Sequence, residues 1–510
     1  MDPISAEAGG IAGFGERLRR RETSAEQAAA AYLQRIRRHE PRLGAFQCVA
    51  SDDAVLADAR RVDALLASGT DLGPLMGVPV AIKDIVRVDG FPTPTVGSRI
   101  PPDVIESIVG GSEGPLLQRI RAAGCIVLGK LKTSEFAYRI DGINRAFGTP
   151  RNPHAANGEL RLPGGSSSGS AVATAAGLTG FAIGTDTGGS VRCPAALCGV
   201  VGLKTTVGRW ETQGMFPLSP VFDSVGALTR TAQDAAIVLS ELTPSRPGSS
   251  LCCLCSGSTT AADEDEAAEV QQLLEAGAGG LRLGRLQLPS LWADCEPVVL
   301  RSVEAALSAL RAAGARVDDA RLPSSVGAAV DRPAILPVDL LATLGADTFR
   351  AVRGEVDPAI AQRLERVLTA STGSVRNQRS SEDAYASAVG AARQSASRVA
   401  RWFHDEAGGG FDALVCPTTL ICAPVLSQES KADPLAEAET AALLLRNTAI
   451  ANDCGLCAIS IPVQQQCAEG RLPVGLQLLG PAGSDAKLAA VAVCIEAVLG
   501  SGPPPPEDTG

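Results

Sequence analysis

The stretch PGGSSSGSAVATAAGLTGFAIGTDTGGS, Pro163 to Ser190, carries most of the information in this 510-residue chain. Two Gly/Ser-rich turns enclose a run of small, helix-compatible residues and a short apolar strand. Glycine adopts backbone angles that other residues avoid, so such turns let several backbone N–H groups converge on one point. Convergent N–H groups beside a serine can stabilise the oxyanion of an acyl-transfer reaction. The stretch therefore indicates an acyl-transfer site.

A second informative segment, GVPVAIKDIVRVDG, lies upstream at Gly77 to Gly90. Its lysine, Lys83, follows a short apolar run that predicts a buried strand. Burial lowers the pKa of a lysine, and a lysine held neutral can act as a base. The alternative for Lys83 is an ordinary strand-end lysine that extends to solvent. Lys83 alone does not decide between the two, and its weight comes from its combination with the Gly/Ser segment.

The three histidines do not suggest a Ser-His-acid triad. His39 and His404 fall in predicted helices, and His154 falls in a polar loop. No G-x-S-x-G elbow stands between a predicted strand and a predicted helix. We expect each histidine at the surface. A lysine is therefore the better candidate for the base.

Composition restricts the function classes. Apolar residues make up 45% and charged residues 20% of the chain, as in globular proteins. The net charge is −10 and the dense basic run is RLRRR, Arg17 to Arg21, which argues against a nucleic-acid-binding surface. Outside the Gly/Ser/Thr-rich segment, no apolar stretch reaches the roughly 18 residues of a membrane span. The N-terminal stretch has no signal-peptide core, so we expect a cytoplasmic protein.

The fourteen cysteines include a cluster at Cys252, Cys253 and Cys255 and a C-x-x-C at Cys454 and Cys457. A zinc site would need a second pair or histidines at ligand spacing, and the histidines are isolated. We expect scattered buried thiols in a reducing compartment and no metal.

The pattern along the chain alternates strands and helices, which indicates an α/β fold. A helix with a capping box is expected at Thr23 to Glu40, and a strand at Gly73 to Ile82. The other expected helices are Pro115 to Ala123, Thr231 to Glu241, Val298 to Ala313 and much of Asp339 to Ala407. The other expected strands are Cys125 to Gly129, Leu281 to Pro289, Ala315 to Leu322 and Phe411 to Thr419, with Asn447 to Val463 and Leu472 to Leu479 closing the sheet.

Four segments divide the chain. Residues 1–22 are expected as an N-terminal extension and residues 23–500 as one catalytic domain. Residues 243–280 are rich in Ser, Gly and acidic residues and are expected as a surface insertion. The Pro-rich residues 501–510 are expected to be a disordered tail.

These motifs together resemble the amidase signature family of serine hydrolases. The family pattern of a Gly-Gly-Ser-Ser turn and a later G-T-D-T-G-G-S-x-R matches Gly164 to Ser170 and Gly184 to Arg192. Its lysine-bearing strand matches Gly77 to Asp84. Weaker similarity continues at Gly202 to Arg209, Pro217 to Ala236, Phe411 to Thr419 and Leu472 to Pro481. The resemblance implies one large α/β domain with a central mixed sheet covered by helices on both faces.

The resemblance also implies a Ser–cis-Ser–Lys triad. Ser190 would be the nucleophile, Ser166 the bridging serine after a cis peptide bond, and Lys83 the base. The backbone N–H groups of Thr187, Gly188, Gly189 and Ser190 would form the oxyanion hole. Asp186 and Arg192 would pair to hold the loop, unless they form an incidental surface pair. Ser168 replaces a family glycine; we expect Ser167 and Ser168 to shape the backbone, with a different bridging serine as the alternative.

The leading functional prediction is a free-standing amidase that uses no cofactor and acts on a small-molecule amide through an acyl-Ser190 intermediate. Carbamate, urea-derivative or ester substrates stay open, as does a homodimer. One alternative is the glutamine-hydrolysing component of a glutamyl/aspartyl-tRNA amidotransferase, although TTVGRWETQGMFPLSP after Lys204 looks more like free-standing amidases. Another is an inactive binding scaffold. We expect no nucleic-acid or membrane partner, and pocket walls from residues 105–114, 142–147 and 339–378.

Overall fold

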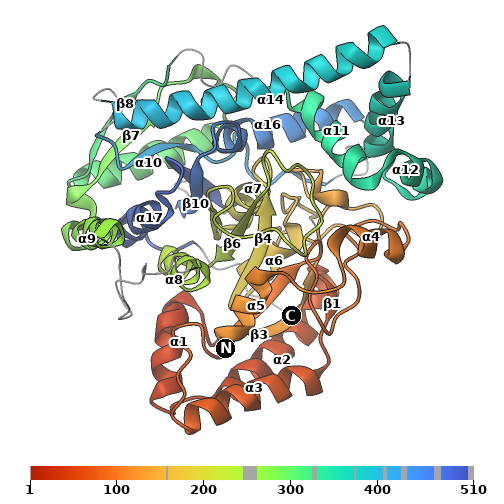
Figure 1. Cartoon of the computed structure of the whole chain (residues 1–510). Helices are drawn as coiled ribbons and strands as arrows, with labels where there is room; N and C mark the ends of the chain where they lie inside the picture. The colour runs from red at the N-terminus through yellow and green to blue at the C-terminus, as the bar shows by residue number, and fades with distance from the viewer. Residues whose placement is uncertain are drawn as a thin grey trace.

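The computed structural model describes residues 2–156, 159–244, 261–323, 330–372, 375–405, 410–426, 434–463 and 472–502. These residues form a single α/β domain built on one eleven-stranded mixed sheet, with helices packed around it (Figure 1). The fold class expected from the sequence is therefore confirmed.

The sheet runs β1-β3-β2-β4-β6-β5-β10-β11-β9-β7-β8 from edge to edge. β2 pairs in parallel with both β3 and β4, and β7 pairs in parallel with β8 and β9, whereas the remaining neighbours are antiparallel. The strands are β1 (Phe46–Val49), β2 (Pro79–Lys83), β3 (Ile126–Leu131), β4 (Phe181–Asp186), β5 (Val201–Lys204), β6 (Ser224–Thr229), β7 (Arg282–Leu286), β8 (Arg316–Ala320), β9 (Ala413–Pro417), β10 (Cys457–Val463) and β11 (Val474–Gly480).

Helices surround the sheet, and the N-terminal ones lie together at one end of the molecule (Figure 1). The α-helices are α1 (Gly10–Arg19), α2 (Ala25–Leu43), α3 (Asp52–Ala67), α4 (Pro102–Val109), α5 (Pro115–Ala122), α6 (Ser168–Ala175), α7 (Arg192–Cys198), α8 (Ala232–Leu242), α9 (Ala261–Ala276), α10 (Pro297–Ala312), α11 (Arg332–Leu344), α12 (Ala346–Val352), α13 (Pro358–Thr372), α14 (Val375–His404), α16 (Pro434–Asp453) and α17 (Asp485–Leu499).

Side-chain alternation along the strands shows how both faces of the sheet are buried. Successive residues of a strand point to opposite faces. In β9, Ala413 and Val415 join the large hydrophobic cluster that contains α10 and α17, whereas Leu414 and Cys416 join a second cluster with α14 and α16. Two separate helical layers therefore cover this half of the sheet.

The first helices and strands follow the expectations from the sequence closely. α2 begins with the expected capping box, in which Ser24 Oγ accepts from the amide of Gln27 and the Gln27 side chain accepts from the amide of Ser24. The remaining expected helices and strands are present within a few residues of the predicted ends, except that the strand expected from Gly73 begins only at Pro79. One expectation is wrong: residues 447–453 do not enter the sheet, because they form the last turns of α16.

The segment before residue 23 packs on the main body. Ile4, Ile11, Phe14 and Leu18 are buried in the same hydrophobic cluster as the central strands. In the expected insertion, α9 lies next to α17, and residues 245–260 lie outside the described residues. Most of the expected tail, residues 503–510, also lies outside them.

Parallel pairing of β2 and β4 places the catalytic candidates. Ile82 of β2 lies opposite Ile183 of β4, so both strands end at the same edge of the sheet. Lys83 is the last residue of β2, and Asp186 is the last residue of β4. Two segments about 100 residues apart in sequence therefore deliver their C-terminal residues to one place.

Candidate active site

Lys83 is fully buried and contacts two hydroxyl groups. Its Nζ donates to Ser166 Oγ at 2.7 Å and to Thr185 Oγ1 at 2.9 Å. Burial lowers the pKa of Lys83 to about 7, and the charges of Asp186 and Asp223 oppose part of that shift. A neutral amine at physiological pH can accept a proton from a neighbouring hydroxyl. Lys83 is therefore not a lysine that extends to solvent.

Two other fully buried lysines differ from Lys83 in their partners. Lys130 forms an ion pair with Asp84 at 2.8 Å, and Lys204 donates to the carbonyl oxygens of Thr205 and Leu456. Within the described residues, one hydrogen bond joins a lysine amine to a serine hydroxyl, and it runs from Lys83 to Ser166.

Ser166 follows a cis peptide bond, as the resemblance implied. Its neighbour Ser167 has a different role: the Ser167 hydroxyl donates to the carbonyl oxygen of Thr185 at 3.2 Å and accepts from the amide of Thr185 at 3.3 Å. Ser168 Oγ donates to the carbonyl oxygen of Lys132 at 3.4 Å. Both hydroxyls bond to backbone, so Ser166 is the serine of this turn that contacts the lysine.

Ser190 lies between β4 and α7 and is 6% exposed. Its carbonyl oxygen accepts from the amide of Ser167 at 3.1 Å, which joins the two Gly/Ser-rich turns. Among the described residues, the Ser190 hydroxyl has no hydrogen-bond partner. The structure thus shows a hydrogen bond between Lys83 and Ser166 but none between Ser166 and Ser190.

Asp186 and Arg192 form a completely buried ion pair at 2.8 Å, not a surface pair. Burial tends to raise the pKa of Asp186, but the Arg192 guanidinium outweighs it and holds that pKa well below its ordinary value. Arg192 also donates to Gln477 Oε1 and Asn452 Oδ1, at 2.6 and 2.7 Å. The pair ties the loop to α16 and β11.

The loop amides separate into two groups. Asp186 accepts from the amide of Gly189 at 2.8 Å and from the amide of Val191 at 3.1 Å. The amides of Thr187, Gly188 and Ser190 donate to no other group in the described part of the chain. Including Gly189 among the oxyanion donors is therefore wrong for this structure, because its N–H is used by the carboxylate that folds the loop.

Asp223 is a site residue that the sequence analysis missed, although it falls in the segment Pro217 to Ala236. It is buried and accepts from Thr187 Oγ1 at 2.6 Å and from the amides of Leu218 and Ser219. Burial raises the pKa of Asp223 to about 6. Its negative charge raises the pKa of Lys83.

A small cavity lies beside these groups. Its polar wall includes Thr185, Thr187 and Asp223. The apolar part of the wall comes from Ile85, Ala137, Met215, Phe216, Pro217 and Leu218. None of the three segments expected to provide pocket walls contributes to this cavity.

His154 is buried, which contradicts the expectation of a surface histidine. Its Nε2 lies 3.0 Å from the carbonyl oxygen of Cys198, and burial lowers the pKa of His154 to about 4. The ten described cysteines have free thiols, eight of them buried, and Cys252, Cys253 and Cys255 lie outside the described residues. In the described ranges, no group of three or more His, Cys, Asp or Glu side chains could hold a metal ion, and no helix could span a membrane.

Comparison with known proteins agrees with this geometry. The sequence model of the Amidase family matches residues 27–489. The chain belongs to the amidase family. It is thus a hydrolase of carbon–nitrogen bonds.

Individual relatives of this amidase cover it almost completely. It is 36% identical over 493 residues to the 2-amino-5-chloromuconic acid deaminase of Comamonas testosteroni, with 96% of each chain covered. It is 35% identical over 496 residues to a glutamyl-tRNA(Gln) amidotransferase component from an Anaeromyxobacter species, with 95% of each covered. The peptide amidase of Stenotrophomonas maltophilia is similar in structure, with a TM-score of 0.70, 29% identity and 98% of each chain covered.

Proposed function

We propose that this chain is a free-standing amidase that cleaves a small carboxamide through an acyl-Ser190 intermediate, with Lys83 as the base and Ser166 as the relay. The observation that carries the proposal is the contact between Lys83 and Ser166. A fully buried lysine with a pKa of about 7 lies 2.7 Å from a serine hydroxyl, next to the turn that bears Ser190.

Acylation follows from the two hydroxyls. Ser166 has one O–H donor and accepting lone pairs, so it can give its proton to neutral Lys83 while it takes the proton of Ser190. The Ser190 hydroxyl has no partner of its own in the described residues, so it is free to turn toward Ser166. As Ser190 Oγ bonds to the amide carbon, the carbonyl oxygen becomes an oxyanion. The unoccupied amides of Thr187, Gly188 and Ser190 can donate to that oxygen.

Release of product reverses the proton path. The proton held by Lys83 returns through Ser166 to the amide nitrogen as the C–N bond breaks, and ammonia or an amine leaves. A water then attacks the acyl carbon and passes its proton through Ser166 to Lys83. The ester bond to Ser190 breaks, and that proton returns through Ser166 to Ser190 Oγ. The net reaction consumes one amide and one water and yields a carboxylic acid and an amine.

The cavity beside Thr187 has a volume of about 20 Å³, enough for about one water molecule, so it does not define the acyl group of the substrate. Its walls are largely apolar, and Asp223 is the carboxyl group among them. The relatives include a deaminase and a peptide amidase, which act on different compounds. A substrate screen is therefore needed to identify the carbon–nitrogen compound that this chain cleaves.

An amidotransferase component is the second candidate, because a relative with that name is 35% identical over nearly the whole chain. The proposal of a free-standing enzyme with no RNA partner depends on the segment after Lys204 and on the net charge of −10. Activity of the purified chain alone separates the two candidates.

An active-site probe tests the proposal. A fluorophosphonate should label the protein once, and Ser190→Ala should abolish both the labelling and the hydrolysis of aliphatic, aryl and dicarboxylic amides. Ser167→Ala is the matched control, because it removes a serine of the other turn and leaves Ser190 in place. This variant should still be labelled. Labelling that survives Ser190→Ala would exclude Ser190 as the nucleophile.

A further inference from the structure

The carbonyl oxygens of the loop from Asp186 to Ser190 accept hydrogen bonds from surrounding residues. The carbonyl of Asp186 accepts from Ser224 Oγ at 2.8 Å, and the carbonyl of Gly189 accepts from the amide of Cys193 at 2.7 Å. The carbonyl of Gly188 accepts from Thr448 Oγ1 at 2.7 Å. Each of these bonds fixes the plane of one peptide.

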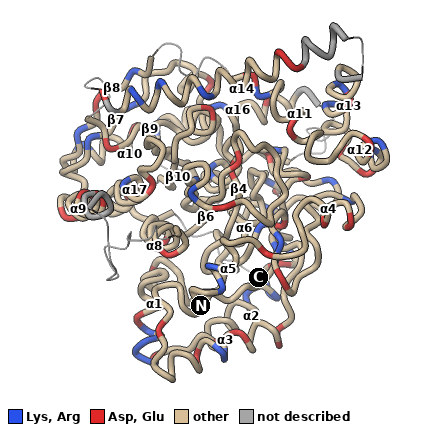
Figure 2. The backbone as a smooth tube through the Cα atoms, viewed as in Figure 1, with Lys and Arg blue, Asp and Glu red and all other residues tan. Residues whose placement is uncertain are grey.

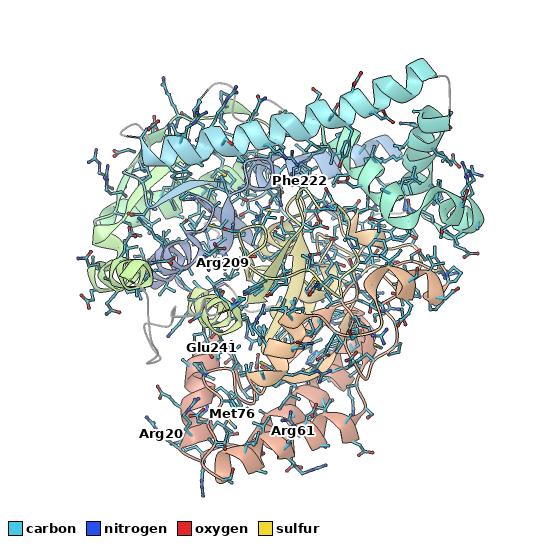
Figure 3. All side chains as sticks on the ribbon, viewed as in Figure 1. Arg20, Arg61, Met76, Arg209, Phe222 and Glu241 are labelled. Atoms are coloured by element: carbon cyan, nitrogen blue, oxygen red, sulfur yellow. The ribbon has the colours of Figure 1, made fainter. Side chains whose placement is uncertain are left out.

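Arg332 binds the carbonyl of Thr187, and the carbonyl of Ser190 accepts from the amide of Ser167. Arg332 is the first residue of α11, which follows Thr187 by 145 residues, and its Nη1 donates to the carbonyl oxygen of Thr187 at 3.0 Å. Nη2 forms an ion pair with Asp453 at 2.6 Å, and the guanidinium lies over the Phe222 ring, 4.6 Å from its centroid. Phe222 lies between the loops above the central strands and the helices α11 and α14 (Figure 3).

A trans peptide points its C=O and N–H in opposite directions. The peptide between Thr187 and Gly188 is trans, since the cis bond found in the described residues is Gly165–Ser166. Arg332 therefore turns the Gly188 N–H away from itself, and that N–H has no other partner in the described residues. The Gly188–Gly189 peptide is oriented in the same way. Its carbonyl accepts from Thr448 Oγ1 on one side, and its N–H donates to Asp186 on the other.

We propose that Arg332 is a positioning residue that aims the Gly188 amide at the oxyanion. This inference rests on the proposed function, since it gives the loop amides their catalytic use. Arg332 does not contact the oxyanion itself. A cation hydrogen-bonded to the Thr187 carbonyl also polarises that peptide and strengthens its N–H as a donor. The buried, preorganised position means that no reorganisation is needed during the reaction.

Kinetics of Arg332→Met test the proposal, with Arg332→Lys as the conservative variant. Removal of one oxyanion donor costs on the order of 10²–10³ in kcat, so we expect about a 10- to 100-fold loss from misaiming one. KM should stay within about threefold, and Arg332→Lys should recover part of kcat. A trifluoromethyl ketone that forms a tetrahedral adduct at Ser190 should lose affinity by the same factor as kcat/KM. Endpoint fluorophosphonate titration gives kcat per competent site.

Arg285→Met is the matched control, because Arg285 also pairs with a carboxylate and lies over an aromatic ring, Glu304 and Trp292, at the far end of the sheet. The proposal is overturned if Arg332→Met has the same kcat per site as this control. It is also overturned if the substitution raises KM and leaves kcat unchanged. A crystal structure of Arg332→Met gives a readout independent of activity. The Thr187–Gly188 peptide should change its orientation, and an unchanged peptide would overturn the inference even if the wild type hydrolysed no amide.

Discussion

Lys83 differs from an ordinary lysine because of where β2 ends. The strand carries it to the sheet edge under the Gly/Ser-rich turns, where two hydroxyls replace water around its amine. Removing water disfavours the charged form, and the nearby carboxylates of Asp186 and Asp223 restore part of its stability. The balance places the pKa of Lys83 at about 7.

The pH dependence of kcat/KM should report this lysine. Protonated Lys83 cannot accept a proton, so activity should fall as the pH drops below about 7. Lys83→Ala should lose about 10²- to 10⁴-fold in rate, the usual contribution of a general base, and remain folded by circular dichroism. Lys487→Ala, at a lysine on α17 that pairs with Glu269, is the control and should retain the profile.

Asp223→Asn refines this measurement. The Asp223 charge raises the pKa of Lys83, so its removal should move the acid limb to lower pH. An acid limb that stays fixed in Asp223→Asn and persists in Lys83→Ala would assign the profile to another group.

At the scale of elements, the turn between β4 and α7 depends on the side chains packed against it. Gly189 has φ +130°, and a Cβ added there would lie 2.0 Å from Thr448 Oγ1. This glycine is needed both for its backbone conformation and for the close approach of α16. Its N–H then serves Asp186, which organises the loop from inside.

Gly189→Ala should therefore displace the loop from Thr448 and lower kcat by about 100-fold or more, on the scale of losing an oxyanion donor. Gly208→Ala is the matched control, because Gly208 also has a positive φ but open space around its Cα. The control should show only the backbone cost of about 1–2 kcal/mol in unfolding free energy, measured by urea denaturation. Equal kcat in the two variants would show that the contact with Thr448 is dispensable.

Lys83, Ser166 and Ser190 could be predicted as catalytic residues from the sequence, because each lies in a short local motif. The sequence could not show Thr448, Asn452 or Arg332 near the loop, since these come from helices more than 140 residues away with no motif of their own. Gln477 and Asp223 fall in segments already noted for family similarity, so a signal for them was present. The Gly189 amide was assigned wrongly because proximity to a nucleophile does not show which way a peptide points.

At the scale of the whole molecule, one sheet joins the strand that ends in Lys83 to the C-terminal half of the chain. β2, β4 and β6 are neighbours in one part of the sheet, and β10, β11 and β9 are neighbours in another. Helix α16, which precedes β10, contacts the loop after β4. The site thus needs both halves of the sheet to be folded. Lys, Arg, Asp and Glu are interspersed over the outer helices in the view of Figure 2, with neither sign gathered on one side of the picture.

The purified chain should release ammonia or an amine from a simple amide without a partner. The three proposed catalytic residues, Lys83, Ser166 and Ser190, all lie in this chain, and its net charge of −10 gives no general attraction to a polyanionic tRNA complex. Ammonia release from an amide panel, measured by a coupled glutamate dehydrogenase assay, should be unchanged by added tRNA, and Ser190→Ala should give the background rate. Amine release from substituted amides is followed by chromatography in the same samples. An amidotransferase component would behave in the opposite way: it would be silent on every simple amide and hydrolyse glutamine only after its partner proteins were added.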